Sequence, residues 1–170
     1  MISKVDLYED GLEEYPQSGV VVGNAAMILW FVLGAIACWF FNPWIGLIYL
    51  IAAFIIVYII FKKIVCTNCY YYGKRCHLGW GILSSKMFNK GDIKLFQTSI
   101  GLKVAAPTYG LLMIVPILLI LISMYQDFDY YKVIVLVLLI IVTGYSAGAE
   151  RKKACGNCKM RKICPGSAVK

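Results

Sequence analysis

Two short segments of the chain each place three cysteines at nearly the same spacing. The first reads CTNCYYYGKRC and the second reads CGNCKMRKIC. A Cys-x-x-Cys turn brings two thiolates within reach of one metal ion or cluster, and two such turns in a chain of 170 residues are a strong metal signal. The candidate metal ligands are Cys66, Cys69, Cys76, Cys155, Cys158 and Cys164.

Basic residues surround both cysteine triplets. Lysines and arginines near a cysteine are expected to lower the pKa of its thiol, which favours the thiolate that binds metal. They are Lys62, Lys63, Lys74 and Arg75 around the first triplet, and Lys152, Lys153, Lys159, Arg161 and Lys162 around the second.

The number and spacing of the thiols indicate which metal they would bind. A zinc ion would take four thiolates, most simply the two Cys-x-x-Cys pairs, and would leave Cys76 and Cys164 unused. An iron-sulfur cluster also takes four thiolates, and a proline after the last cysteine, here Pro165, occurs in ferredoxin-type loops. The sequence favours an iron-sulfur cluster, with zinc as the alternative. His77 is a candidate for a non-cysteine ligand or, alternatively, a polar residue at headgroup depth.

The segment CGNCKMRKICPG resembles the last three ligands of the iron-sulfur loop in the helix-hairpin-helix DNA glycosylases. The resemblance implies that Cys155, Cys158 and Cys164 ligate a cluster. It covers only residues 155–166, and the upstream fourth cysteine of that loop is missing from this tail. The fourth ligand would therefore come from the first triplet or from a non-cysteine side chain. The resemblance implies no activity on DNA, because the rest of that fold is absent.

Four apolar runs are long enough to cross a hydrocarbon core of about 30 Å. The chain is 61% hydrophobic, and runs such as VIVLVLLIIV keep no polar face at a helical period. We therefore expect an all-α polytopic membrane protein in contact with a lipid bilayer. The runs lie near Val20 to Phe41, Trp44 to Phe61, Thr108 to Tyr125 and Tyr131 to Ala147.

The positions of the basic residues predict the orientation. Residues 62–103 carry eight lysines and arginines and residues 150–170 carry seven, whereas the short connections between paired spans carry none before Lys132. By the positive-inside rule, both termini and both triplets are cytosolic. Juxtamembrane basic residues explain the net charge of +8 without a specific nucleic acid, and the basic face is a candidate docking surface for a cytosolic or membrane protein. The acidic residues before Pro16 either lie against the basic loops or form a solvated arm.

The two triplets also indicate an internal repeat, because Cys66 and Cys155 are 89 residues apart and each follows an apolar hairpin. The expected fold has four transmembrane helices as two parallel-repeat hairpins, each followed by a cytosolic cysteine loop, with a pseudo-two-fold axis along the membrane normal. The segment GWGILSSKMFNKG, residues 79–91, is expected to form a short interfacial helix on the inner leaflet, with a lid over the cysteine loops as the alternative. The expected segments are an acidic cytosolic arm (1–18), the first hairpin (19–61), a basic loop with the first triplet (62–107), the second hairpin (108–149) and a basic tail with the second triplet (150–170).

In a reducing cytosol a disulfide framework is disfavoured, so the cysteines are expected to bind metal or to perform redox chemistry. The preferred function is electron transfer at the membrane surface through an iron-sulfur centre. The alternatives are a structural zinc site that forms a protein-recruiting platform, and a thiol-disulfide redox protein. The sequence contains no carboxylate pair, phosphate loop or Ser/His/Asp set, and it leaves open whether the protein is an enzyme.

Overall fold

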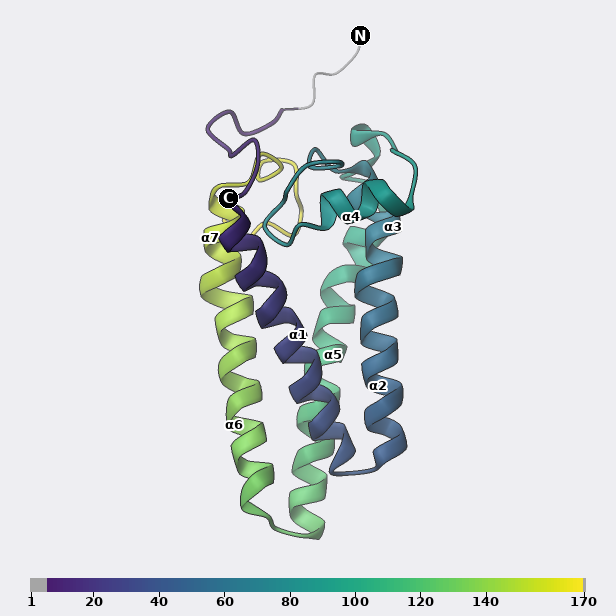
Figure 1. Cartoon of the computed structure of the whole chain (residues 1–170), viewed down its shortest axis with the longest axis vertical. Coiled ribbons are helices and arrows are strands. Elements are labelled where there is room, and N and C mark those ends of the chain that lie inside the picture. Colours follow the sequence, from purple (N-terminus) through teal and green to yellow (C-terminus); the bar gives the residue numbers. More distant parts are fainter. Residues whose placement is uncertain (1–5, 170) are drawn as a thin grey trace.

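The computed structural model describes residues 6–169, and within this range the chain consists of helices and connecting loops. Residues 1–5 of the expected acidic arm and Lys170 of the expected tail lie outside the described residues. Four helical runs are long and apolar enough to cross a membrane, which confirms the predicted number of spans. They stand together as a bundle (Figure 1). The runs are Gln17–Trp39, Pro43–Asn68, Ile100–Gln126 and Tyr130–Gly156.

Short turns at one end of the bundle join the spans in pairs (Figure 1). Asn42 and Asp129 begin the second helix of each pair, and their side-chain oxygens accept hydrogen bonds from the backbone N–H groups of Trp44 (2.9 Å) and Tyr131 (3.1 Å). Such caps satisfy amide groups that a helix start leaves unpaired. The paired helices are α1 (Gln17–Trp39) with α2 (Pro43–Ile55), and α5 (Ile100–Gln126) with α6 (Tyr130–Gly144).

The second helix of each pair contains a π-helical segment shortly before its first cysteine. These segments are η1 (Ile56–Ile60) after α2 and η4 (Tyr145–Glu150) after α6. They begin 89 residues apart, the same offset that separates Cys66 from Cys155. The two halves of the chain therefore share a helical irregularity in register with their cysteines.

Beyond the π-helical segments, both runs stay helical past the expected ends of the spans. Cys66 begins η2 (Cys66–Asn68), which follows α3 (Phe61–Ile64), and Cys155 lies in α7 (Arg151–Gly156). The first cysteine of each triplet is therefore on a helix end, whereas residues 62–107 and 150–170 were expected to be loop and tail. The third span likewise begins at Ile100, earlier than the apolar run alone indicates.

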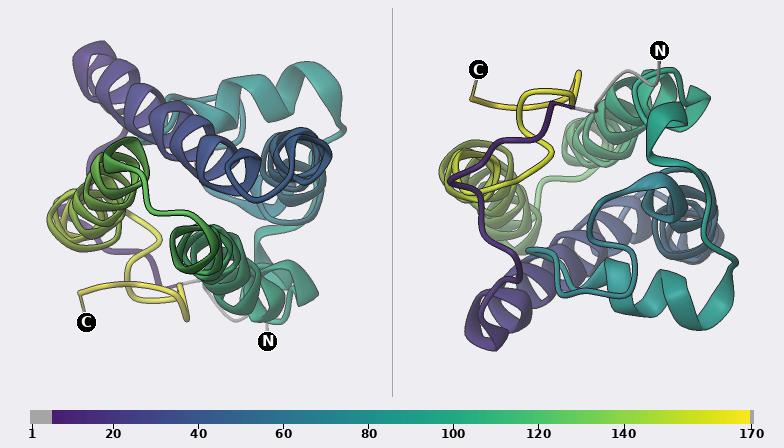
Figure 2. Two further views of the ribbon diagram at one scale, coloured as in Figure 1. Left: turned by 90° about the horizontal axis from the view of Figure 1, so that it is seen from below. Right: turned by 90° about the horizontal axis from the view of Figure 1, so that it is seen from above.

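Helix α1 lies obliquely across the bundle and packs against α2, α5 and α6 (Figure 2). Tyr49 on α2 fits against Gly34 of α1, where an added Cβ would lie only 2.6 Å from the Tyr49 hydroxyl oxygen. That hydroxyl donates a buried hydrogen bond of 2.7 Å to the carbonyl of Leu112 on α5. Because Pro116 has no N–H to offer this carbonyl, Tyr49 supplies the missing donor inside the apolar core.

The fourth span carries Gly144 and Gly148 at the small-xxx-small spacing typical of close helix packing, but no such contact forms there among the described residues. No described atom lies within 4 Å of a Cβ built on Gly144 or Gly148, apart from the local backbone. The tight contacts are instead at Gly34 and at Gly46, where an added Cβ would lie 2.8 Å from the carbonyl oxygen of Ala35. A small-xxx-small spacing marks a possible close contact, but the direction of the helix face decides whether one forms.

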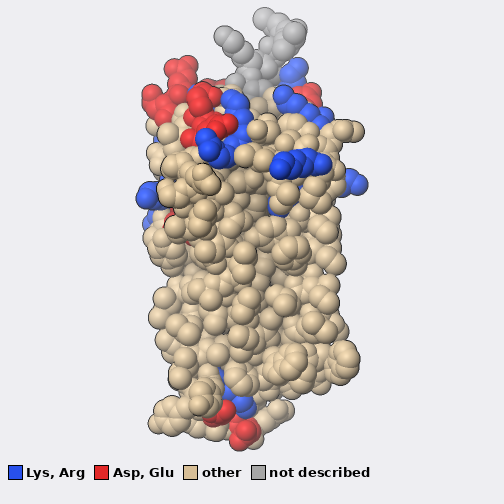
Figure 3. All heavy atoms as spheres, in the orientation of Figure 1, with Lys and Arg blue, Asp and Glu red and all other residues tan. Residues whose placement is uncertain are grey.

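Charged side chains gather at the end of the bundle that carries the cysteines (Figure 3). The long middle of the molecule shows almost none in this view, and most of its exposed side chains are large and apolar, as a lipid environment requires. Exposed aromatic residues mark the opposite end, where they suit the membrane interface. These are Trp39, Phe41 and Trp44 at the first turn, and Tyr125, Phe128, Tyr130 and Tyr131 at the second.

The segments beyond the helical bundle form a second packed layer, which we call the head. It consists of the N-terminal arm (6–16), the first cysteine loop (66–79), α4 (Trp80–Met87), η3 (Ile93–Leu95) and the C-terminal tail (157–169). Residues 6–16, residues 157–169 and both cysteine triplets lie at this end of the molecule (Figures 1 and 2).

Candidate metal centre

The N-terminal arm holds the first cysteine loop and the C-terminal tail together through its backbone. The N–H of Tyr8 donates to the carbonyl of Lys159, and the N–H of Leu12 donates to the carbonyl of Asn157, both at 2.9 Å. On the other side, the N–H of Tyr15 donates to the carbonyl of Arg75, also at 2.9 Å. One segment thus binds residues next to both triplets.

Two tyrosines complete this junction. The Tyr71 hydroxyl donates to the carbonyl of Leu12 (2.7 Å) and accepts from the backbone N–H of Lys159 (3.1 Å). The Tyr15 hydroxyl donates to the carbonyl of Ala154 at 2.6 Å, and the rings of Tyr15 and Tyr71 pack edge to face with centroids 5.7 Å apart. Burial raises the pKa of both hydroxyls, so they remain protonated donors.

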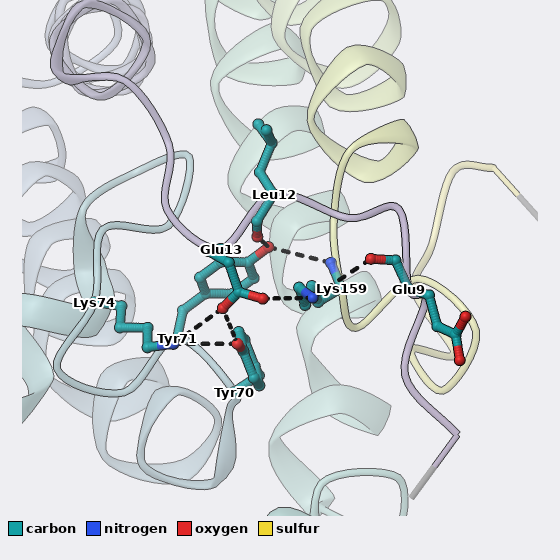
Figure 4. A network of polar contacts seen from close by, with 7 residues as sticks. All are labelled: Glu9, Leu12, Glu13, Tyr70, Tyr71, Lys74 and Lys159. Atoms are coloured by element: carbon teal, nitrogen blue, oxygen red, sulfur yellow. Dashed lines mark hydrogen bonds and ion pairs between the residues drawn. The ribbon is translucent and has the colours of Figure 1, made fainter.

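Glu13 ties the same three segments together through its carboxylate (Figure 4). It lies 3.2 Å from Nζ of Lys74 and 2.5 Å from Nζ of Lys159, and it accepts a hydrogen bond from the Tyr70 hydroxyl. These three partners lower the pKa of Glu13 to about 2, with Lys159 the largest cause. The alternative in which the acidic arm lies against the basic loops is confirmed.

Further ion pairs extend this match between acidic arm and basic loops. Arg75 lies 2.9 Å from a carboxylate oxygen of Glu14, and Lys162 lies 3.1 Å from one of Asp6. Several of the basic residues beside the triplets therefore direct their charge toward the arm. Surface pairs of this kind contribute little each, and their effect here is chiefly to fix which segments meet.

A small hydrophobic cluster fills the centre of the head. It packs loop, arm and tail around two tyrosines and brings four of the six triplet cysteines together on its periphery. The buried members are Tyr15, Tyr71, Phe96, Met160 and Ile163, and the cysteines packed against them are Cys69, Cys76, Cys158 and Cys164.

The sulfurs of the two triplets lie near enough for a charge on one to act on others. Within each triplet all three cysteines are neighbours in this sense. Across the triplets, Cys158 is a neighbour of both Cys69 and Cys76. The fold therefore brings together thiols that are far apart in the sequence, and all six are free rather than joined in disulfides.

The expectation that basic neighbours lower the thiol pKa is wrong for three of these cysteines. Burial is the largest cause and raises the pKa of Cys69, of Cys158 to about 11, and of Cys164. Charge on neighbouring cysteines raises it further. The physical reason is that the thiols are packed into the head cluster, while basic side chains such as Lys74 and Lys159 turn toward Glu13.

Within residues 6–169, no three His, Cys, Asp or Glu side chains converge closely enough to hold one metal ion. The cysteines are gathered but not in ligand geometry.

His77 is oriented by two neighbours. Its Nε2 lies 3.1 Å from a carboxylate oxygen of Glu150 at the end of η4, and its ring packs edge to face on Tyr15 with centroids 5.7 Å apart. The contact with Glu150 gives His77 a role in joining the first cysteine loop to the fourth span. A carboxylate on one ring nitrogen is also the usual support of a histidine that binds metal through the other.

Helix α4 packs closely against the first cysteine loop. An added Cβ on Gly81 would lie 1.8 Å from the carbonyl oxygen of Tyr71, so only glycine permits this approach. The buried Ser84 hydroxyl donates to the carbonyl of Lys62 at 3.3 Å. Ile82, Leu83 and Met87 remain exposed, as expected for an interfacial helix, whereas Trp80 packs inward on Tyr58 with ring centroids 5.8 Å apart.

The residues that build the junction are mostly ones the sequence does not single out. Tyr15, Tyr71 and Gly81 carry no metal-binding pattern, and the only advance sign is the tyrosine run 70–72 between two cysteines. Searches of protein-family models, curated proteins and solved structures find no match to this chain.

Proposed function

We propose that the cysteines of the head form a metal centre and that the protein is a membrane-bound electron carrier. The observation that carries this proposal is that Cys69 and Cys76 of the first loop and Cys158 of the tail pack against the same small hydrophobic cluster, although 82 or more residues separate the loop cysteines from Cys158 in the sequence. An arm, two tyrosine hydroxyls and a carboxylate all act to keep these segments together. Because so many contacts hold these cysteine-bearing segments together, we infer that thiols of both triplets bind one metal centre.

The donor set fits a thiophilic metal. Thiolate sulfur selects zinc, copper(I) and iron-sulfur clusters, whereas carboxylate and carbonyl sites suit magnesium or calcium. Ligation would require the side chains to converge and to lose protons that burial now favours, so binding and closure of the loops would be coupled. The ligands would come from Cys66, Cys69, Cys76, Cys155, Cys158 and Cys164, with His77 as a further candidate.

An iron-sulfur cluster at this place would supply one-electron chemistry at the membrane surface. The local resemblance of residues 155–166 to a cluster-binding loop supports this choice over zinc. The tail also lines an open surface cavity of about 770 Å³ with Arg161, Lys162 and Cys164, and Asp6 of the arm, the ion-pair partner of Lys162, borders the same cavity. A protein partner docked over Arg161 at this cavity would approach the thiol of Cys164.

The proposal also includes the orientation of the protein in the membrane and an origin of its two halves by duplication. The concentration of lysines and arginines at the head supports a cytosolic head with both termini inside. The matching offset of the π-helical segments and of the cysteines supports two hairpin-plus-cysteine units that arose as copies.

The test is an absorption spectrum with iron, sulfide and zinc analysis on full-length protein purified without oxygen in detergent. We expect a broad band near 400 nm, roughly where sulfur-to-iron charge transfer absorbs, with iron and sulfide that are lost in a Cys155→Ser/Cys158→Ser variant. A Cys38→Ser variant is the matched control, because Cys38 is buried in α1 within the bundle. Stoichiometric zinc without colour would replace electron transfer by a structural platform. Absence of both metals, with thiols that form disulfides on mild oxidation, would overturn the proposal in favour of thiol-disulfide chemistry.

A further inference from the structure

Lys62 is a lysine inside the protein whose ammonium group is not hydrogen-bonded. It lies in α3, four residues before Cys66, and its exposed fraction is 0%. Among the described residues its Nζ finds no hydrogen-bond partner. A buried charge without a partner is strongly unfavourable, so it requires an explanation.

Lys132, the other buried lysine among the described residues, shows how a buried ammonium group is usually stabilised. Lys132, at the opposite end of the bundle, has an exposed fraction of 6%. Its Nζ donates to the carbonyls of Ser123 (3.1 Å) and Asp127 (2.7 Å) and lies 3.8 Å from the Asp127 carboxylate. Lys132 is thus compensated by acceptors and by a negative charge, whereas Lys62 is not.

The surroundings of Lys62 are aromatic on two sides. Its Nζ lies 4.2 Å from the ring centroid of Tyr58 and 5.6 Å from that of Trp80. The indole N–H of Trp80 is itself buried without an acceptor among the described residues. Aromatic faces attract a cation, but they accept no strong hydrogen bond from either donor. Nζ of Lys62 and the indole N–H of Trp80 are therefore two neighbouring donors without a hydrogen-bond acceptor among the described residues.

Lys62 precedes Cys66 by four residues, about one helical turn, and the thiols whose charge acts on it are those of Cys66 and Cys76 in the first triplet. Thiols carry little charge, but metal-bound thiolates carry a full one, and four of them exceed the charge of a divalent ion. A centre built on these sulfurs would be anionic and would lack a counter-charge on its membrane side. Lys62 is the cation at that side.

We propose that Lys62 is the buried counter-cation of the metal-thiolate centre. This inference rests on the proposed function. Lys62 is a positioning residue, since it would act through the charge of Cys66 and Cys76 rather than ligate the metal. Outer-shell partners of this kind stabilise metal sites and tune their potentials.

The inference makes opposite predictions for the metal-free and metal-loaded protein. Lys62→Met removes a buried charge and keeps most of the volume, so the metal-free variant should unfold at the same temperature or higher. The same change should weaken metal binding at least tenfold, since the loss of an outer-shell partner commonly has an effect of about 10- to 100-fold. A purely structural lysine would give the reverse pattern.

The experiment uses full-length protein in detergent, stripped of metal and titrated with Co²⁺, whose thiolate complexes absorb, and then with Zn²⁺ in competition. Lys62→Arg, which keeps the charge, should bind nearly as well as the wild type. Lys63→Met is the matched control, because Lys63 is exposed, and should change neither property. Normal Zn²⁺ affinity in Lys62→Met would overturn this inference alone. Failure of the wild-type protein to bind either ion would overturn the metal centre, and this inference with it.

Discussion

The hydroxyl of Tyr71 accepts a hydrogen bond of 3.1 Å from the backbone N–H of Lys159, the residue that follows Cys158. Tyr71 belongs to the first cysteine loop and Lys159 to the tail, so this bond joins the two triplets directly. The same hydroxyl donates to the carbonyl of Leu12 in the arm. One oxygen atom therefore connects the arm, the first cysteine loop and the tail, three of the segments that make up the head.

Removal of that oxygen should loosen the head without disturbing the bundle. Tyr71→Phe loses both hydrogen bonds and leaves the N–H of Lys159 without its partner, at a cost of about 1–3 kcal/mol. Thermal unfolding and hydrogen exchange measured segment by segment would show faster exchange in the arm and tail but not in α1 or α2. Tyr125→Phe is the control, because Tyr125 is 94% exposed at the other end. Unchanged exchange in the tail of Tyr71→Phe would contradict this account of the junction.

Gly81→Ala should displace the first cysteine loop. The new methyl would lie 1.8 Å from the carbonyl oxygen of Tyr71 and 2.4 Å from that of Lys74, and backbone atoms on both sides cannot yield without moving the loop. We expect a loss of about 1–3 kcal/mol, typical of overpacking, together with lower metal content.

The matched control for this substitution is Gly144→Ala. Gly144 ends α6, and a Cβ there meets no described atom within 4 Å beyond the local backbone. Alanine should be neutral or slightly stabilising at this position. Equal behaviour of the two variants, measured as unfolding temperature and metal content, would show that the loop does not need the close approach at Gly81.

Acid should release the arm. The pKa of Glu13 is about 2, below its ordinary 4.5, because Lys159, Tyr70 and Lys74 favour the carboxylate. A lowered pKa means that the contribution of Glu13 to stability is complete above about pH 4.5 and is lost as the pH falls toward 2. Hydrogen exchange at the backbone N–H of Leu12 and Tyr15, corrected for intrinsic rates, should report the release.

Glu13→Gln should weaken the protection of the arm at neutral pH and remove most of its change between pH 4.5 and 2. Glu9→Gln is the control, because the structure assigns the Glu9 carboxylate no ion pair among the described residues. If Glu13→Gln kept the full acid dependence of the wild type, the release would belong to Asp6 or Glu14 instead.

In the bundle, Tyr49 and Pro116 should be energetically coupled. Tyr49→Phe leaves the carbonyl of Leu112 without a donor in the apolar core, at a cost of about 1 kcal/mol for a hydrogen bond between membrane helices. Pro116→Ala restores the helical N–H that this carbonyl lacks, so Tyr49→Phe should cost less in that background. A double-mutant cycle of unfolding free energies measures the coupling, and strict additivity would argue against it.

The spans could be predicted from the sequence because lipid imposes a simple requirement, about twenty apolar residues in a helix that satisfies its own backbone. The contact between the acidic arm and the basic loops was open as one alternative, since opposite charges near one surface attract. Neither argument needs knowledge of where a particular side chain points.

The remaining features of the fold and the site depend on the direction in which individual side chains point, which the amino-acid composition does not show. Lys62 and Lys63 are equivalent in the sequence, yet the first is fully buried and the second exposed. Gly144 and Gly148 have the spacing of a contact, but close packing falls on Gly34 and Gly46. The thiol pKa values were predicted in the wrong direction because the count of nearby lysines does not show that Glu13 already holds two of them.

The central claim is that cysteines of both triplets bind one metal centre. X-ray absorption at the metal edge of the full-length protein, as purified without oxygen, tests it most directly. We predict a shell of sulfur atoms at about 2.3 Å, with fewer sulfur neighbours or loss of metal in both Cys69→Ser and Cys158→Ser. A shell of only nitrogen and oxygen, or a sulfur shell that either variant leaves intact, would contradict the account.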